Sequence, residues 1–414
     1  FPFLKVGPVS SIRLNSQFEL IFIAFIGLCV ALSFPANLLR LYGVDFFAES
    51  YPKIILIFSF FLASINLALV FNKKVSLYVF FIVLLYSCFL SYILVVGVLR
   101  GNSGIIYGLK YFILPVVAVF FLMGRGFLFF FYKSSGFWKL ILFSHLLLFC
   151  VYIFLLYGKV YPGIGVSSLA YSALFFFVNG NPLLFCISSL LILLEGKRSV
   201  LVSMLLALAL CRLIDKKALT IFISIFLYLI VFLVFSILAL YLMAYFDGFG
   251  AFDRINLINP FSGRFDLAVG SSGRYGELVS AFGDRTLGEL FAGMGAGFEY
   301  QWDLGYESQQ SGETKGYLHI SPANYLLIGG VFGCLIFIFI SSLPFFAKRM
   351  PGDPKVRKVA FCFGIYSILQ SSFGFNFATD IVTLVLIIGP FILASAGLRP
   401  HDGNRAEVQA TQKI

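Results

Sequence analysis

A single histidine stands at an abrupt change of polarity in the chain. His319 is one of three histidines among 414 residues, and in "LHISPANYLLIGGVFG" it lies where a long polar segment meets a very apolar one. Imidazole takes up or releases a proton near neutral pH. Pro322 favours a helix start, because its missing N–H is not needed in the first turn. His319 is therefore a candidate base or hydrogen-bond donor, with Asn324 and Tyr325 as candidate substrate contacts. The alternative is an ordinary surface histidine.

A second stretch, "SSGRYGE", combines an arginine with a carboxylate. Arg274 follows a glycine, and the planar guanidinium is suited to bidentate recognition of phosphate. Glu277 comes three residues later and is a candidate base. Tyr275 between them is a candidate substrate contact. The alternative interpretation is an ion pair between Arg274 and Glu277 on successive turns of a helix.

A third stretch, "EGKRSV", places Lys197 and Arg198 at a turn between two short apolar runs. Basic residues at membrane depth are costly and tend to mark function. The alternative is a pair of side chains that extend to the membrane surface. We predict that Arg198 and Arg274 converge on one pocket, because a diphosphate needs donors from more than one side.

A fourth stretch, "GMGAGFEYQW", is rich in glycine. No strand is expected before it and no Gly-Lys-Ser/Thr follows, so a nucleotide-binding loop is not supported. Close backbone packing is the commoner use of such glycines. Tyr300 and Trp302 are candidates for sugar stacking or for anchoring at a membrane surface. Arg264 and Arg285 complete the candidate binding residues.

Composition indicates the elements that position these residues. The chain is 60% hydrophobic and 12% charged, with 53 Phe and a mean hydropathy of +0.98. A soluble core could not hide so much apolar surface, so we predict an all-α protein with many membrane spans. About twelve spans are expected by length. They lie near 18–36, 53–71, 75–97, 105–123, 137–157, 167–180, 182–195, 199–212, 218–246, 323–345, 359–374 and 379–396.

The distribution of charge predicts the orientation. The dense clusters of Lys and Arg fall on the side that also holds both termini, which is therefore expected to be cytoplasmic. The same rule explains the net charge of +11 without nucleic acid. We predict nine spans in 1–246, a large outer loop over 247–320 folded as a small helical cap, three spans in 321–396 and a cytoplasmic tail over 397–414. The loop is functional rather than a connector, because it is long and polar.

The order of these features resembles the O-antigen polymerases of the Wzy type and their relatives, the O-antigen ligases. The resemblance rests on many short-looped helices, "GKRS" at an outer turn, a long loop with "SGRYGE" and "GAGF", and the helix entry "HISPANYLLIGGVFG". The ligases usually carry "HN-x-x-L". Here His319 and Asn324 are separated by four residues, which favours a polymerase.

The resemblance implies an inverting, metal-independent glycosyltransferase of the membrane-embedded C type without a cofactor. A growing glycan would move from undecaprenyl diphosphate onto a new lipid-linked repeat unit. The active site would face the periplasm from the bacterial inner membrane. A chain-length regulator and a flippase are the implied partners. Arg198 and Arg274 would offset the diphosphate charge. For His319 we favour donation to a phosphate, since Glu277 offers another base.

Other functions stay open on sequence alone. A ligase would transfer the polysaccharide to the lipid A core. A transporter of lipid-linked oligosaccharide would favour several mid-span charges and repeated halves. The chain has one such charge, Lys110, and no repeat. A purely structural membrane protein would leave the large outer loop unexplained.

Overall fold

The computed structural model is mostly helical, with almost no strand. It describes residues 19–30, 45–70, 77–123, 126–155, 166–194, 198–212, 260–261, 263, 266, 274–302, 313–373 and 381–397. Before the cap lie helix Glu19–Val30, α2 (Asp45–Val70), α3 (Leu77–Leu99), α4 (Ile105–Leu122), α5 (Leu128–Lys133), α6 (Ser135–Leu155), α7 (Val166–Val178), α8 (Pro182–Leu194) and α9 (Arg198–Cys211). The cap holds α13 (Arg274–Phe282), α14 (Leu287–Ala292), β1 (Tyr300–Trp302) and β2 (Glu313–Lys315). After it come α15 (Ser321–Ser342), the 3₁₀ helix η2 (Leu343–Arg349), α16 (Pro354–Phe373) and α17 (Ile381–Gly397).

Two helical segments among the described residues are long and apolar enough to cross a membrane. They are Val79–Leu99 and Ser321–Arg349. Seven further apolar helices in the described part have 10–17 residues. The positions of the predicted apolar segments agree with helices, as at 105–123 for α4 and 182–195 for α8. The segment predicted at 218–246 lies outside the described residues, and the number of spans stays a prediction.

Several helices extend beyond the predicted apolar segments. α2 begins at Asp45 rather than near 53, and α16 begins at Pro354 rather than near 359. Hydropathy finds only the apolar part of a helix, whereas charged first turns are helical as well. The short α5 and η2 were not predicted, because each is too short for a periodic signal.

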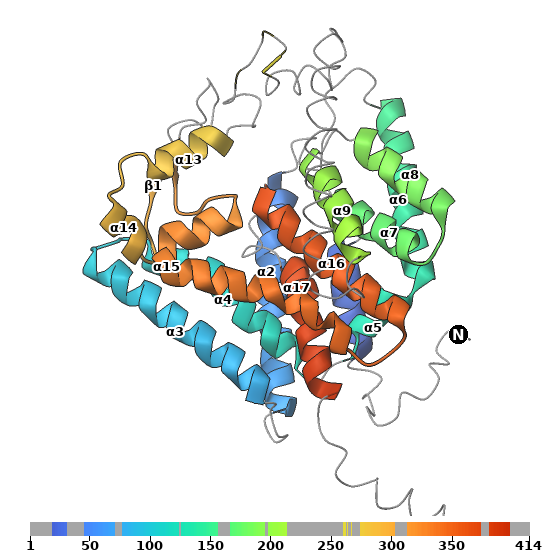
Figure 1. The fold of residues 1–414 in the computed structure, drawn as a ribbon, viewed down its shortest axis with the longest axis horizontal. Helices are drawn as coiled ribbons and strands as arrows, with labels where there is room; N and C mark the ends of the chain where they lie inside the picture. The colour runs from blue at the N-terminus through green and yellow to red at the C-terminus, as the bar shows by residue number, and fades with distance from the viewer. Residues whose placement is uncertain are drawn as a thin grey trace, which may run out of the picture.

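Helices α16 and α17 occupy the middle of the molecule. Figure 1 shows α3, α4 and α15 on one side of them and α6 to α9 on the other. Aromatic rings fill the contacts on the α6 to α9 side. Trp138 packs against Phe363 with ring centroids 5.2 Å apart, and its indole N–H donates to the Phe131 carbonyl at 2.7 Å. This packing holds α6 against α16.

Asn66 closes the C-terminal end of α4. Its amide nitrogen donates to the carbonyl oxygens of Phe120, Phe121 and Met123 at 2.7, 3.3 and 2.9 Å. The last carbonyls of a helix have no partner within the helix, and an apolar environment supplies no water to replace one. Asn66 therefore joins α2 to α4.

We expect Asn66→Leu to destabilise the protein by about 1–3 kcal/mol for each carbonyl left without a donor. Thermal unfolding in detergent, monitored by size-exclusion chromatography, measures the loss of stability. Ser64→Ala is the matched control, since Ser64 is exposed on the same helix. Equal melting temperatures for the two variants would contradict this role of Asn66.

A break in α15 receives the glycine-rich segment. Gly330 adopts φ 59° and ψ −145° inside the helix, which interrupts the regular helical backbone near the Leu327 and Ile328 carbonyls. The amides of Met294 and Gly295 donate to those carbonyls at 2.8 and 2.9 Å. A side chain at Gly330 would collide with the backbone of residues 291–293. Glycine is required there by both the positive φ and the close approach.

The opposite side of the same segment packs on α3. The Ala296 amide donates to the Ile93 carbonyl at 2.7 Å, and the Asn102 side chain donates to the carbonyls of Met294 and Ala296 at 2.9 and 3.0 Å. A Cβ on Gly97 would collide with the Ala296 carbonyl. The segment is thus held between two apolar helices. The prediction of close backbone packing is confirmed.

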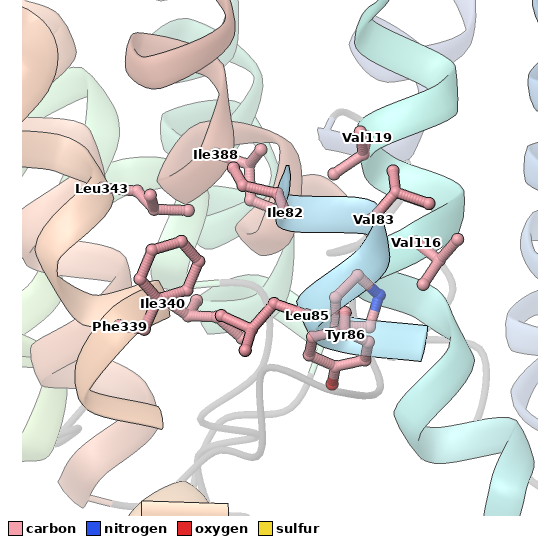
Figure 2. A pocket seen from close by; sticks show the side chains of 11 residues that line it. Ile82, Val83, Leu85, Tyr86, Val116, Val119, Phe339, Ile340, Leu343 and Ile388 are labelled. Carbon is pink, nitrogen blue, oxygen red and sulfur yellow. The ribbon is translucent and has the colours of Figure 1, made fainter. Parts of the chain in front are cut away.

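An apolar hollow lies deeper among the helices, between α3, α4, α15 with η2, and α17. Figure 2 shows its lining, which includes Ile82, Tyr86, Val116, Phe339 and Ile388. His319 and Glu277 are not among the lining residues, so the hollow is separate from the cap.

Candidate functional site

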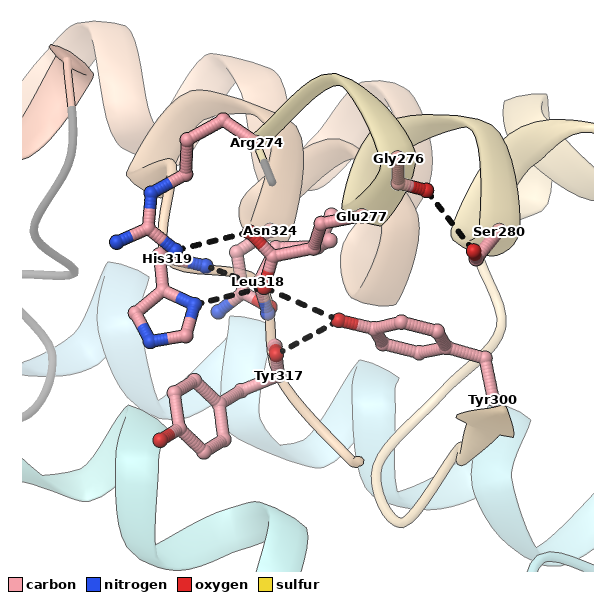
Figure 3. A network of polar contacts seen from close by, with 9 residues as sticks. All are labelled: Arg274, Gly276, Glu277, Ser280, Tyr300, Tyr317, Leu318, His319 and Asn324. Carbon is pink, nitrogen blue, oxygen red and sulfur yellow. Dashed lines mark hydrogen bonds and ion pairs between the residues drawn. The ribbon is translucent and has the colours of Figure 1, made fainter. Parts of the chain in front are cut away.

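Glu277 and His319 meet in the cap, although 42 residues separate them in the chain. His319 Nδ1 lies 2.7 Å from Glu277 Oε1, and the backbone amide of His319 donates to the same oxygen at 3.3 Å. Glu277 has a side-chain exposure of 1%, whereas His319 is 24% exposed. Figure 3 shows the other ring nitrogen, Nε2, pointing away from Glu277. A buried carboxylate therefore orients a histidine that keeps one nitrogen toward the open side.

Two further donors complete the surroundings of Glu277. Arg274 lies 3.4 Å from Oε2, and the Tyr300 hydroxyl lies 3.3 Å from Oε1 and 3.1 Å from the Tyr317 carbonyl. Both carboxylate oxygens thus already accept hydrogen bonds (Figure 3). The sequence analysis offered Glu277 as a candidate base. To accept a proton in that role, Glu277 would have to lose hydrogen bonds from these donors. The geometry instead makes it the residue that positions His319.

The local sequence explains how the two elements present these groups. In α13 the apolar and small residues Gly276 and Ala281 face inward beside Glu277, while Tyr275 and Val279 lie on the exposed face. Arg274–Phe282 is thus a helix, in agreement with the prediction of a helical cap.

The entry into α15 is closed by a side chain of the helix itself. Asn324 Oδ1 accepts from the backbone amide of Leu318 at 3.0 Å, and the backbone amide of Asn324 donates to the Ile320 carbonyl at 2.9 Å. Pro322 lies in the first turn, as predicted. His319 therefore sits on a short segment that is fixed on both sides, which is what a catalytic geometry requires.

The charges around Glu277 set its protonation state. Burial by itself would raise the pKa of Glu277, but the hydrogen bond and charge of His319 and the charge of Arg274 outweigh it. The pKa of Glu277 is therefore held below its ordinary value, and the carboxylate stays ionised at neutral pH. Burial and the Glu277 charge raise the pKa of Tyr300, so its hydroxyl keeps its proton and donates.

Arg274 forms the ion pair with Glu277 that was one of its two interpretations from the sequence. It pairs with Glu277 through one terminal nitrogen, as expected for residues three apart on a helix. Its side chain is 27% exposed, and Figure 3 shows the second terminal nitrogen directed away from the carboxylate. The pair leaves the guanidinium at the rim of the site, beside His319.

Trp302 has one face covered rather than offered to a sugar. It is 4% exposed, and Lys315 Nζ lies 3.0 Å from the centre of its ring. Its ring centre is 6.1 Å from that of His319, and its indole N–H has no partner among the described residues. Lys315 lies opposite Tyr300 in the β1–β2 pair, so this small hairpin adds strand to a cap that we predicted as helical. Trp302 thus supports His319 from the side.

The remaining predicted contacts separate into core and surface. Tyr325 is fully buried, and its hydroxyl lies 2.7 Å from that of Tyr86, so in this conformation it joins α15 to α3 rather than touching a substrate. Tyr275 is 49% exposed. Arg285 lies over the Phe298 ring at 4.9 Å.

The structure does not describe the side chains of three basic residues that were predicted as site residues. Lys197 and Arg264 lie outside the described residues. Arg198 is the first residue of α9, but its side chain is not described. Its convergence with Arg274 therefore stays a prediction.

Sequence reasoning missed Tyr317. Its carbonyl accepts from Tyr300, and its ring centre lies 5.5 Å from that of His319. The available signal was its position two residues before His319, since alternate residues of an extended segment share a side. Lys315 lies another two residues earlier and was also not predicted.

Comparisons of the sequence with known proteins find no match, either among protein-family models or among curated proteins. The function is therefore inferred from the chemistry of Glu277, His319 and Arg274, together with the sequence motifs around them.

Proposed function

We propose that this protein is a membrane-embedded glycosyltransferase that polymerises a surface polysaccharide from lipid-linked repeat units. The observation that carries the proposal is the Glu277–His319 pair at the entry of α15, with 2.7 Å between Oε1 and Nδ1. A histidine held through one nitrogen by a buried carboxylate is the usual arrangement of a general base. The resemblance to the Wzy-type polymerases supplies the substrate class.

We propose a reaction that uses this arrangement. Nδ1–H of His319 donates to Glu277, so Nε2 of the neutral ring has a lone pair for the proton of an acceptor hydroxyl. As that proton leaves, the hydroxyl oxygen bonds to the anomeric carbon of the growing chain. The bond from that carbon to the phosphate oxygen breaks, and undecaprenyl diphosphate departs with the electron pair. Attack opposite the leaving group inverts the anomeric centre.

This assigns His319 a different role from the one favoured on sequence. Donation to phosphate was preferred because Glu277 offered another base. Glu277 is instead buried and already accepts four hydrogen bonds, with a pKa held below its ordinary value. A carboxylate in that state is a weak base, so the proton passes to His319.

Arginine side chains supply the second chemical requirement, which is to stabilise the leaving group. Negative charge accumulates on the departing diphosphate, and a guanidinium offsets it best when fixed in advance. Arg274 is oriented by Glu277 beside His319. Arg198 is proposed as the second donor from the other side.

The position of His319 matches a lipid-linked substrate. α15 begins at Ser321, so His319 lies just outside a segment long and apolar enough to cross the membrane. The hydrocarbon core is about 30 Å thick, and the lipid tail places the diphosphate at its boundary. We propose that this boundary is the periplasmic face of the bacterial inner membrane. A flippase would deliver the repeat units, and a chain-length regulator would act with the enzyme.

The test is reconstitution of the purified chain in liposomes with synthetic undecaprenyl-diphosphate repeat units. A ladder of products that differ by one repeat supports a polymerase. Transfer of preformed polysaccharide to added lipid A core, without a ladder, would favour a ligase instead. Movement of labelled repeat units across the bilayer without a new glycosidic bond would contradict the proposal and indicate a transporter.

A further inference from the structure

α14 carries two large apolar side chains on its outer face. Leu287 and Phe291 are one helical turn apart, with exposures of 87% and 70%. The polar side of the same short helix is occupied, because Thr286 and Glu289 form a capping box and Glu289 pairs with Arg100 at 3.3 Å. Two large apolar side chains on one face of a short helix, bordered by polar residues, form a candidate interaction surface.

The end of α3 fixes the position of this helix. The Tyr92 hydroxyl donates to the Ala292 carbonyl at 2.6 Å, and Arg100, directly after α3, binds Glu289. Figure 1 shows α14 beside the C-terminal end of α3. α14 therefore lies at one end of the segment Val79–Leu99.

The depth of α14 follows from the length of that segment. Its 21 residues rise about 1.5 Å each, which matches a hydrocarbon core of about 30 Å. The outer face of α3 near this end is apolar and exposed, with Val95 at 55%, Val98 at 60% and Leu99 at 80%. The end of α3 beside α14 is therefore itself suited to contact lipid.

We propose that α14 is an interfacial helix whose Leu287 and Phe291 side chains insert into the outer acyl region of the bilayer. Interfacial helices bury their apolar face about 5–10 Å into the boundary between headgroups and acyl chains. Lipid is the occupant because α14 lies at the end of a helix of membrane length, where the neighbouring residues of α3 are also apolar and exposed. The proposal is independent of the reaction catalysed.

Fluorescence quenching by brominated lipids tests the contact directly. Phe291→Trp exchanges one exposed aromatic residue for another, so the fold is retained, and Leu287→Trp is a second probe. The native Trp138 and Trp302 are 1% and 4% exposed and give a constant background. The proteins are reconstituted in phosphatidylcholine and phosphatidylglycerol vesicles, with bromines near the headgroup or near the chain end. Thr314→Trp, at an exposed position of β2, is the matched control.

We expect the added emission of the Phe291→Trp and Leu287→Trp proteins to be quenched several-fold more than that of Thr314→Trp, most by the shallow bromines. Quenching no greater than in the control would overturn the proposal and leave a protein partner, such as a second copy of the chain, as the occupant. Strongest quenching by the deep bromines would also contradict an interfacial position. Neither outcome depends on polymerase activity.

Discussion

Replacing His319 with glutamine is expected to slow formation of the glycosidic bond by about 10²–10⁴-fold, the contribution of a well-placed general base. Glutamine keeps a polar side chain of similar reach, but it cannot accept the hydroxyl proton. The rate of the first elongation step in liposomes measures the loss. Because the base acts in the chemical step, kcat is expected to fall while KM for the lipid-linked unit changes little.

Glu277→Gln separates the base from the residue that positions it. Glutamine can still accept a hydrogen bond from His319, but the negative charge that stabilises the protonated ring is lost, and Arg274 loses its partner. We expect a large fall in kcat with His319 intact. Val279→Ala is the matched control, because Val279 is half exposed on the same helix. Equal rates for Glu277→Gln and Val279→Ala would contradict a positioning role.

The pH dependence distinguishes the two roles of His319. A general base works only in its neutral form, so that role predicts a wild-type rate that falls in acid, whereas donation to a phosphate predicts a rate that survives acidification. If the rate were unchanged in acid and His319→Gln gave near-normal ladders of products, His319 would be a surface residue without a catalytic role. The proposed site would then consist of the arginines alone.

Gly330→Ala is expected to have the largest effect on stability. A non-glycine residue at positive φ costs on the order of 1–3 kcal/mol. The new Cβ also collides with the carbonyl of Phe291, and backbone cannot move aside as a side chain can. Displacing the segment would break the bonds from Met294 to Leu327 and from Gly295 to Ile328, each worth about 1 kcal/mol. Together these losses exceed the effect of most single substitutions.

Thermal unfolding in detergent measures this effect, and Gly288→Ala is its matched control. Gly288 lies in α14, and a Cβ there meets no atom within 4 Å. Alanine at a helical position is expected to leave stability unchanged or raise it by up to about 1 kcal/mol. If Gly330→Ala melted together with Gly288→Ala, the glycine contact between the cap and α15 would not be important for the fold.

The positions of the helices were determined by the sequence itself. Apolar runs predicted α4 and α8 to within a residue or so, because burial of apolar side chains is recorded locally in hydropathy. The helical cap predicted from the sequence agrees with α13, and Pro322 predicted the start of α15. The close packing of "GMGAGF" was also predicted, since few other uses of such glycines are common.

The tertiary structure alone decided which side chains meet. No local pattern pairs Glu277 with His319 across 42 residues, yet that contact determines which of the two we propose as the base. The tertiary structure also places Lys315 over Trp302 and buries Tyr325 against Tyr86. The sequence had predicted Trp302 and Tyr325 as substrate contacts. The physical reason is that propensity and hydropathy act over a few residues, whereas these contacts depend on how α13, the hairpin and α15 close on one another through the glycine segment.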